Sequence, residues 1–433
     1  MAVQNIAAVN AAIKEILIPV LEDANEKRAD TFSTIDEGTP EEINARGTFL
    51  SILTLDHAIE RTTTNEGGAF PTASSPSYVK ATLPHITVER TVGMTRAVSR
   101  NNKANQINVN VVKKNFTNAM DKIYKSMNRY MFGDGSGELA RVGAGSVGAG
   151  GTAVDTTTKI ITCNGTTNLF GSRFVADIGQ QLEARSTSGT LRNGGALTKM
   201  TVTAVDRENK KFTVDQLPTD LAANDVIYNF DSYGTAPYGF DYHFAKTGTW
   251  LNLTRGSSNI GLNAVRRSLG GEKLTGGALD QLLGDMKFKL GGEPSKDGIE
   301  IIWAPTQCNS YKDEGYELKQ FVMTVGQTGR GANIDMSFSG VTHSGIKTRE
   351  DVDCQINRVI VNHKGLMKKF QLQKIQIIQD DGGPLRLQTG ADGYVDAYVG
   401  FIQGVFNVAP ETPWMGAMMT DLAYEGYSNG SIA

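Results

Sequence analysis

The sequence predicts an α+β fold, and three observations lead to that prediction. Residues 108–132 carry one apolar stripe at helical spacing without a proline or glycine, which is typical of a long helix. Short runs rich in β-branched and aromatic residues recur in 200–233 and 358–408, which favours strands. The chain has 433 residues, of which 39% are hydrophobic and 21% charged, so it can build two or more domains.

The long helix is the element around which the other predictions are arranged. At 1.5 Å per residue it would extend about 37 Å, roughly twice the usual length. It ends at a glycine-rich turn, which we interpret as a helix cap because glycine adopts the left-handed backbone of a helix end. Phosphate-binding loops place their glycines before a helix, so this turn is not predicted to bind phosphate. The apolar stripe and the turn consist of Val109, Val112, Phe116, Met120, Ile123, Met127 and Tyr130, followed by Gly133, Asp134, Gly135, Ser136 and Gly137.

Two segments precede the long helix. Residues 5–30 read as an amphipathic helix interrupted at Pro19, either docked on its own core or laid as an arm across a neighbouring subunit. Residues 48–100 read as a long two-stranded excursion whose tip, 66–76, has loop chemistry. An isolated hairpin is barely stable in water, so this excursion should rest on something, and another subunit is a natural candidate.

A flexible glycine-rich connector, 143–151, follows the helix and leads into a β-rich block, 153–233. Strands are expected at Met200–Val205, Lys211–Val214 and Val226–Phe230, and their short polar flanks indicate a small barrel-like module inserted in a larger domain.

Mixed helix and strand patterns begin at Gly234. Thr275 can cap a helix with an apolar stripe, and Ile299–Ala304 reads as a buried strand ended by Pro305, with another helix directly after it. Later strands are expected at 358–362, 370–379, 385–389 and 394–408, the last of them unusually long.

Composition excludes several classes of protein. The net charge of −3 argues against sequence-specific DNA recognition, which usually needs a basic surface. Three cysteines, none in a C-x-x-C pair, do not make a disulfide framework. No apolar run reaches the roughly 18 residues of a membrane span, and no signal peptide is visible, so we expect cytoplasmic synthesis and no membrane partner.

No catalytic or metal-binding constellation emerges, so we expect neither an enzyme nor a cofactor. The five histidines are scattered, and Asp241 with His243 reads as a solvated loop pair rather than half a metal site. Cys308 reads as a buried structural thiol rather than a nucleophile. Residues 380–383 lack the alternating carboxylates of a calcium loop. The basic residues of the long helix, which are Lys113, Lys114, Lys122, Lys125 and Arg129, read as a solvated face that could touch nucleic acid only non-specifically.

Three features together resemble the major capsid protein of tailed double-stranded DNA bacteriophages, the Hong Kong 97-type fold. The long helix ending in Asn128–Ala140 is similar to the spine helix of that family and the turn after it. The residues Glu66, Gly67, Gly68, Phe70 and Pro71 are similar to the tip of its extended loop, the E-loop. The order of parts is also similar, from N-terminal arm to long late strands.

The resemblance implies a role for each region. It implies an N-terminal arm at 1–45, an E-loop at 46–100 lying over the adjacent subunit, a P-domain spine helix and connector at 101–150, and an inserted β-rich domain at 151–233. It further implies an A-domain at 234–364, P-domain strands at 365–408 and a C-terminal A-domain segment at 409–433. The E-loop tip residues would then be subunit-interface residues.

The function implied by the resemblance is a non-enzymatic subunit that assembles as hexamers and pentamers into an icosahedral shell around viral DNA, located in the virion. A separate scaffolding protein is implied because no long N-terminal segment precedes the arm, and portal and decoration proteins are further implied partners. An encapsulin-like cellular nanocompartment shell remains the alternative. An enzyme on an α/β scaffold and a bacterial surface protein are less favoured, because a catalytic constellation and a signal peptide are not found.

Overall fold

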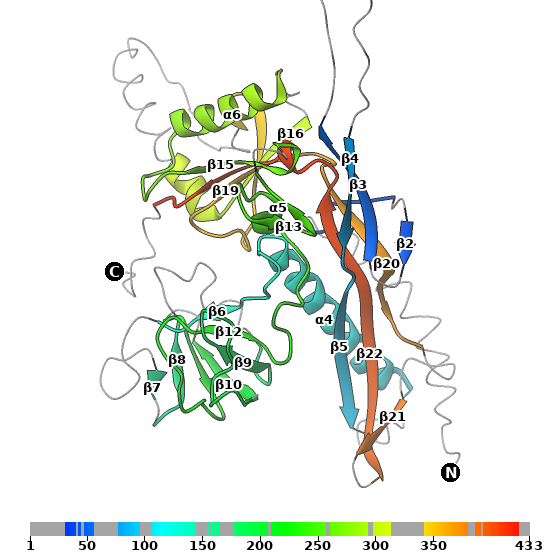
Figure 1. Ribbon diagram of the computed structural model, residues 1–433. Helices are drawn as coiled ribbons and strands as arrows, with labels where there is room; N and C mark the ends of the chain where they lie inside the picture. Colours follow the sequence, from blue (N-terminus) through cyan, green and yellow to red (C-terminus); the bar gives the residue numbers. More distant parts are fainter. Residues whose placement is uncertain are drawn as a thin grey trace, which may run out of the picture. The chain divides into compact units, whose positions relative to one another are not determined.

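The computed structural model describes residues 31–39, 42–44, 47–55, 77–95, 105–143, 154–155, 157–163, 177–196, 198–206, 209–256, 260–292, 298–312, 342–379, 386–390 and 393–423. The chain divides into two compact units. Figure 1 labels their helices and strands. The first unit comprises residues 1–51, 80–131 and 367–409, and the second comprises 52–79, 132–366 and 410–433.

A five-stranded sheet forms the framework of the first unit. Its order is β1 (Asp36–Glu37), β20 (Met367–Ile377), β22 (Gly393–Pro410) and β21 (Arg386–Gly390), and β5 (Ile86–Thr95) also pairs with β22. β5 and β22 run antiparallel over ten residue pairs. The Gln403 side chain donates a hydrogen bond of 2.7 Å to Glu89, 314 positions earlier in the chain. Distant parts of the sequence are thus joined in one sheet.

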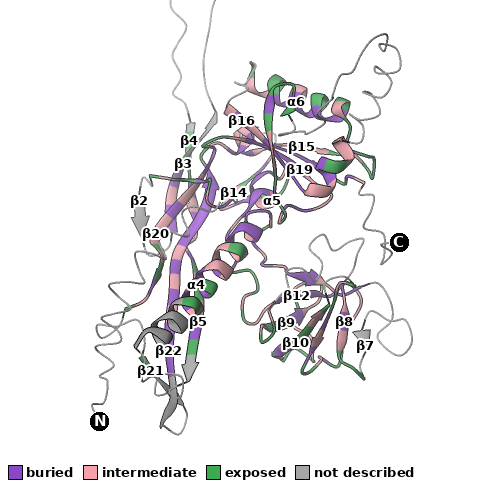
Figure 2. Ribbon diagram, turned by 180° about the vertical axis from the view of Figure 1, so that it is seen from behind, coloured by how far each residue is buried: buried purple, intermediate pink, exposed green. Residues whose placement is uncertain are grey.

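The long helix α4 (Asn105–Tyr130) packs against β5. Its buried positions recur every three or four residues, as the apolar stripe in the sequence predicts (Figure 2). At its C-terminal end the Asn128 side chain accepts a hydrogen bond of 3.1 Å from the backbone N–H of Phe32, whose ring contacts Phe406 at 5.5 Å between centroids. In the described part of the helix, the buried apolar side chains are Phe116, Ala119, Met120, Ile123 and Met127.

A separate three-stranded sheet forms the base of the predicted excursion. Its order is β2 (Glu42–Asn44), β3 (Gly47–Leu55) and β4 (Ser77–Leu83). The returning strand that the sequence predicts is divided in two, because β4 pairs with β3 whereas β5 pairs with β22. The break falls at Pro84, which has no backbone N–H to donate to a ladder.

The β-rich block of the second unit is a small barrel. Its strands, in sheet order, are β6 (Ala140–Arg141), β12 (Val226–Asn229), β9 (Gln181–Arg185), β10 (Met200–Asp206), β11 (Lys211–Val214), β8 (Ile160–Thr162) and β7 (Val154–Asp155). A β-bridge between Val142, directly after β6, and Cys163, directly after β8, closes the strands into a barrel. The interior is apolar and includes Leu182, Met200, Phe212 and Ile227, each 0–1% exposed.

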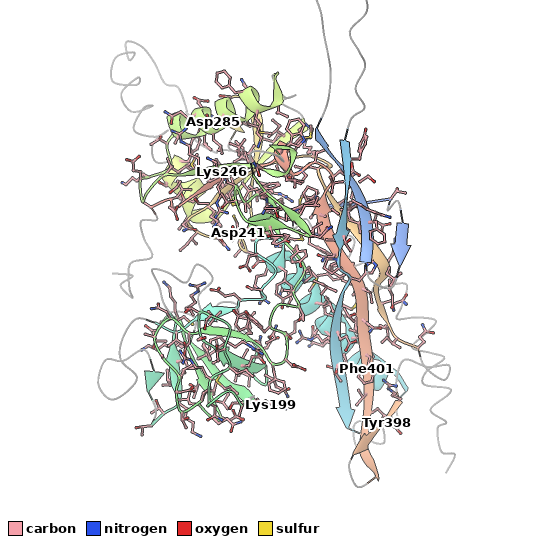
Figure 3. The ribbon with its side chains drawn as sticks, viewed as in Figure 1. Lys199, Asp241, Lys246, Asp285, Tyr398 and Phe401 are labelled. Carbon is pink, nitrogen blue, oxygen red and sulfur yellow. The ribbon has the colours of Figure 1, made fainter. Side chains whose placement is uncertain are left out.

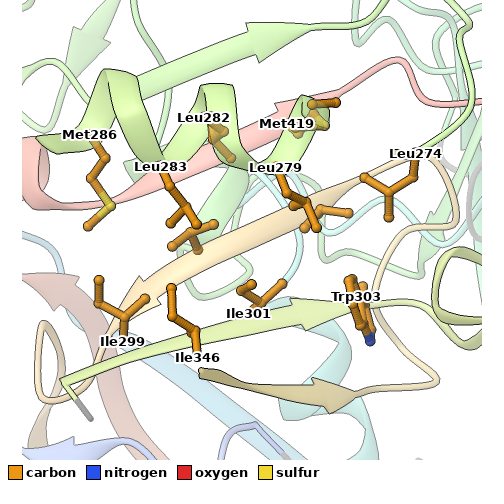
Figure 4. Close-up of a cluster of buried hydrophobic side chains, with 14 of the residues drawn as sticks. Leu274, Leu279, Leu282, Leu283, Met286, Ile299, Ile301, Trp303, Ile346 and Met419 are labelled. Atoms are coloured by element: carbon orange, nitrogen blue, oxygen red, sulfur yellow. The ribbon is translucent and has the colours of Figure 1, made fainter. Parts of the chain in front are cut away.

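A helix packed on a six-stranded mixed sheet forms the other part of the second unit. The sheet order is β15 (Val265–Ser268), β23 (Ala417–Thr420), β19 (Val359–His363), β16 (Ile299–Trp303), β18 (Ile346–Glu350) and β17 (Thr342–His343). Helix α6 (Gly276–Leu290) covers one face of this sheet, and we call the pair the α/β layer. Figure 4 shows its core, in which Leu279, Leu282, Leu283 and Met286 point at the sheet.

Shorter elements complete the second unit. They are the short helix α5 (Phe240–His243), the hairpin of β13 (Thr249–Trp250) and β14 (Leu253–Thr254), and the 3-10 turns η2 (Ile260–Leu262) and η4 (Pro413–Met415).

The α+β class is confirmed, and so are several local predictions. The Thr275 hydroxyl accepts a hydrogen bond of 3.2 Å from Ala278 N–H and caps α6. The strand predicted at Ile299–Ala304 is β16, residues 305–312 directly after it are helical, and the β10–β11 hairpin has the predicted partners. Helix α4 begins three residues before the predicted start and ends two before the predicted end. No helix of the described ranges is long and apolar enough to cross a membrane.

The α/β layer depends on the packing of Leu282, which is fully buried. Replacing Leu282 with Ala should lower the free energy of unfolding by about 2–5 kcal/mol, because the lost methyl groups leave a cavity. Gln281→Ala, at the neighbouring exposed position of α6, is the control and should change it by less than about 0.5 kcal/mol. Urea unfolding followed by tryptophan fluorescence measures both, and equal midpoints for the two variants would contradict this core.

Candidate functional site

The predicted subunit-interface residues at the E-loop tip, namely Glu66, Gly67, Gly68, Phe70 and Pro71, lie outside the described residues. The strands that lead to and from them, β3 and β4, pair as predicted. On β4, Tyr78 is 62% exposed and Lys80 holds its ammonium 4.0 Å from the centroid of the Phe49 ring of β3. The base of the excursion is therefore a paired ribbon with an exposed aromatic side chain.

The glycine-rich turn after α4 is ordered by its own side chains. The Asp134 carboxylate accepts a hydrogen bond of 2.9 Å from Ser136 N–H, and the Ser136 carbonyl accepts one of 2.9 Å from Gly234 N–H. Gly135 and Gly137 have φ of +86° and +82°, a left-handed backbone that favours glycine. These contacts define the geometry of the turn within the second unit.

The glycine-rich turn is not the cap of α4, contrary to the prediction from the sequence. The helix ends at Tyr130, where Met131 N–H donates to the carbonyls of Met127 and Asn128, and Gly133 does not have a positive φ. The two left-handed glycines stand further along, where their backbone approaches other parts of the second unit. Gly135 lies against the ring of Tyr238, and Gly137 lies near the carbonyl of Ser232.

The basic face predicted for α4 is smaller than the sequence suggests. Lys114 and Lys125 are exposed, but Arg129 is only 5% exposed and its guanidinium stacks over the Tyr130 ring at 4.6 Å. The side chain of Lys113 is outside the described part of the helix. A buried arginine adds little to a surface that would attract phosphate groups.

Asp241 and His243 are not a solvated loop pair. They belong to α5, in which Figure 3 labels Asp241. The Asp241 carboxylate forms ion pairs with Arg266 at 3.2 Å and Arg358 at 2.7 Å. His243 is fully buried and its Nδ1 accepts a hydrogen bond of 2.9 Å from Trp250 Nε1. Both side chains therefore stabilise the second unit. Among the described residues, no group of three His, Cys, Asp or Glu side chains could hold a metal ion.

Cys308 is a buried structural thiol, as the sequence predicts. It lies in the helical residues after β16 and donates a hydrogen bond of 3.0 Å to Glu350, which also accepts 2.9 Å from Lys312 Nζ. Burial, followed by the hydrogen bond to Glu350, raises the pKa of the Cys308 thiol to about 11. The thiolate needed for nucleophilic attack is therefore disfavoured.

The structure brings together one polar set that the sequence does not reveal. His343 Nδ1 lies 2.8 Å from the Tyr311 hydroxyl, and its Nε2 lies 2.9 Å from the Asp280 carboxylate. These residues come from β17, from the helical residues after β16 and from the first turns of α6. A carboxylate, an imidazole and a phenol in series could pass a proton, and they also tie three elements of the α/β layer together. Asp280, Tyr311 and His343 are far apart in the sequence, so the sequence alone does not indicate that their side chains come into contact.

No family model matches the sequence, and no curated protein matches it. Similar chains are found among solved structures. The chain is similar to the capsid asymmetric unit of cyanophage A-1(L), with 11% identity, a TM-score of 0.44 and coverage of 90% of each chain. It is also similar to a structure from Mycobacterium phage Patience, with 8% identity, a TM-score of 0.43 and coverage of 98% of this chain and 90% of that one.

A third similar structure is the SrpI encapsulin complex from Synechococcus elongatus PCC 7942. It has 9% identity and a TM-score of 0.38, and 99% of each chain is covered.

The glycine requirement in the turn after α4 is testable. Gly135→Val should destabilise the protein, because a Cβ at this position would lie 2.3 Å from Cδ1 of Tyr238 and a β-branched residue resists a positive φ. Gly194→Val is the control, since Gly194 has φ of +64° but no atom within 4 Å of a Cβ. We expect a loss about 1–3 kcal/mol larger for Gly135→Val in thermal or urea unfolding. Equal losses would show that Tyr238 does not confine this turn.

The assignment of Cys308 as structural is also testable. At pH 8, iodoacetamide should label Cys308 on the order of 100-fold more slowly in the folded protein than in urea, because a pKa near 11 leaves little thiolate. Mass spectrometry of the digested protein measures the rate. Labelling at the rate of the unfolded chain would favour a reactive thiol.

Proposed function

We propose that this chain is the structural subunit of a closed protein shell, a major capsid protein that encloses double-stranded DNA. The subunit performs no chemistry. It works by presenting extended segments and folded parts to neighbouring copies, which then assemble as hexamers and pentamers.

The topology of the chain is the observation that carries the proposal. β5 and β22 are neighbours in one sheet, and α4, the barrel and all of the α/β layer except β23 lie between them in the sequence. The β3–β4 ribbon directly precedes β5 in the chain, and the segment between these strands, 56–76, is too polar and glycine-rich to bury a core of its own. Such a ribbon gains stability by lying on another subunit.

The charge of the chain supports the same function. A shell wall that packages DNA must not hold it tightly, and affinity for DNA rises with the number of phosphates that Lys and Arg neutralise. The net charge of −3 and the burial of Arg129 both limit that number.

We assign the regions in these terms. Residues 1–45 are the arm, the β3–β4 excursion is the E-loop, and α4 with the late strands is the P-domain. Because β5 pairs with β22, we place β5 in the P-domain rather than in the E-loop. The barrel is the inserted β-rich domain, and the α/β layer with the C-terminal strand β23 is the A-domain.

Removal of the excursion tip tests this proposal. Deleting Thr62 to Ser77 should leave a folded, soluble subunit that no longer forms closed shells, because the contact with the neighbouring copy is lost. Sedimentation velocity should show fast particles for the intact chain and only small species for the deletion, with circular dichroism confirming that both are folded.

A glycine–serine replacement of equal length is the control, since it keeps the span but removes the side chains of the tip. Normal shells from the deletion would contradict the E-loop assignment. Particles of the intact chain that carry a protein cargo instead of DNA would identify the chain as the shell protein of a nanocompartment rather than as a capsid protein.

A further inference from the structure

Two exposed apolar side chains lie in opposite charge environments within the α/β layer. Phe288, in the last turn of α6, is 89% exposed, and Val352, in the turn after β18, is 65% exposed. Phenylalanine and valine usually bury their side chains. Each of these two therefore marks a surface that can gain stability from a partner.

The surface around Phe288 is basic. It comprises Lys246, Lys287, Phe288 and Lys289, which we call the basic patch. Lys289 Nζ donates to the carbonyl of Asn263, and burial together with the nearby Lys246 lowers the pKa of Lys289 to about 8. The carboxylate of Asp285, one turn earlier in α6, pairs with Arg267 at 3.3 Å. Figure 3 labels Lys246 and Asp285 in this part of the second unit. An incoming carboxylate would relieve the repulsion between Lys246 and Lys289.

The surface around Val352 is acidic. The turn reads Glu350, Asp351, Val352, Asp353, and we call it the acidic turn. Glu350 keeps 44% of its side chain exposed while pairing with Lys312 at 2.9 Å, and Asp351 orients the turn by accepting a hydrogen bond of 2.9 Å from Asp353 N–H. The turn thus carries three carboxylates, of which that of Glu350 pairs with Lys312.

These two surfaces lie at opposite ends of the α/β layer. Glu350 pairs with Trp303, at the C-terminal end of β16, so the acidic turn follows at that end. The N-terminal end of α6 lies there too, since Gly276 is near Tyr311 and His343. Figure 4 shows the other end, where Met286 faces Ile299 at the start of β16.

The distance between the two surfaces excludes a contact within one copy. Helix α6 has 15 residues and is about 22 Å long, and the basic patch lies at its far end from the acidic turn. Two complementary surfaces that cannot meet in one molecule can meet only between molecules. Opposite charges around an apolar centre are also the usual arrangement of a specific contact.

We propose that the basic patch of one copy binds the acidic turn of the next, with Phe288 and Val352 at the centre of the contact. Such a head-to-tail contact uses different surfaces on the two copies, so it continues from copy to copy and closes into a ring when the rotation between copies allows it. The inference rests on the proposed shell function and names the surfaces that join copies around a ring.

Charge reversal tests this contact in the full-length chain. Lys287→Glu makes the patch less basic, and Val352→Lys makes the turn less acidic, so each variant alone should show a roughly tenfold or greater loss of rings and shells. The two variants mixed should assemble again, because the glutamate of one copy then faces the lysine of the other. Electron microscopy and mass photometry measure both results, and alternating copies restrict the restored rings to even numbers such as hexamers.

Matched controls separate this contact from general effects of charge. Lys211→Glu and Ile178→Lys make the same changes at exposed positions of the barrel module and should assemble normally. Unfolding midpoints of all four variants should equal that of the intact chain, and Phe288→Ser provides a second variant of the patch that introduces no charge.

Each outcome decides between the two proposals. Normal assembly of Lys287→Glu or Val352→Lys would overturn the contact while leaving the shell function in place, and so would two folded variants that fail to assemble when mixed. Failure of the intact chain to form rings or shells at all would overturn the shell function and this contact together.

Discussion

The antiparallel pairing of β5 with β22 is the constraint on which the architecture depends. It joins residues 86–95 to residues 397–406, so most of the chain is an insertion between two neighbouring strands. The entropy cost of closing a flexible loop grows only slowly with its length, by about 0.6 kcal/mol for each doubling. A long insertion can therefore be held at both ends by a modest set of contacts. These are the ten residue pairs between β5 and β22, the Glu89–Gln403 hydrogen bond and the packing of α4 on β5.

This topology lets the barrel and the α/β layer fold on cores of their own, and the α/β layer also takes β23 from the chain after β22. The barrel closes around Leu182, Met200 and Phe212, and the α/β layer closes around α6. Each core is complete within its part, so the outer surfaces remain available for neighbours. A shell subunit needs this combination of self-sufficient cores and exposed connecting segments, because many weak contacts made at once give a stable assembly.

Local signals explain how much of the fold could be predicted from sequence. The Thr275 cap, the stripe on α4 and the alternation in β10 and β11 are patterns within a few residues, and the structure follows them. The pairing of β5 with β22 was missed, because the excursion and the strand next to it read as one continuous segment until Pro84 breaks it. Neither strand has a sequence pattern that identifies a pairing partner about 300 residues away.

At the candidate sites too, the sequence predicted local features but not contacts between distant residues. Burial of Cys308 followed from its place after a strand, whereas the ion pairs of Asp241 with Arg266 and Arg358 depend on side chains far away in the chain. The set of Asp280, Tyr311 and His343 likewise forms only when three elements pack. Glycine in the turn after α4 was correctly singled out, but its reason is the ring of Tyr238 and not the end of the helix.

Electron microscopy of the intact, purified chain over a wide range of concentration shows whether copies of the chain assemble. We expect closed particles, or rings of five or six copies, whose abundance rises with concentration. A chain that is fully folded and yet remains monomeric at every concentration would contradict this expectation.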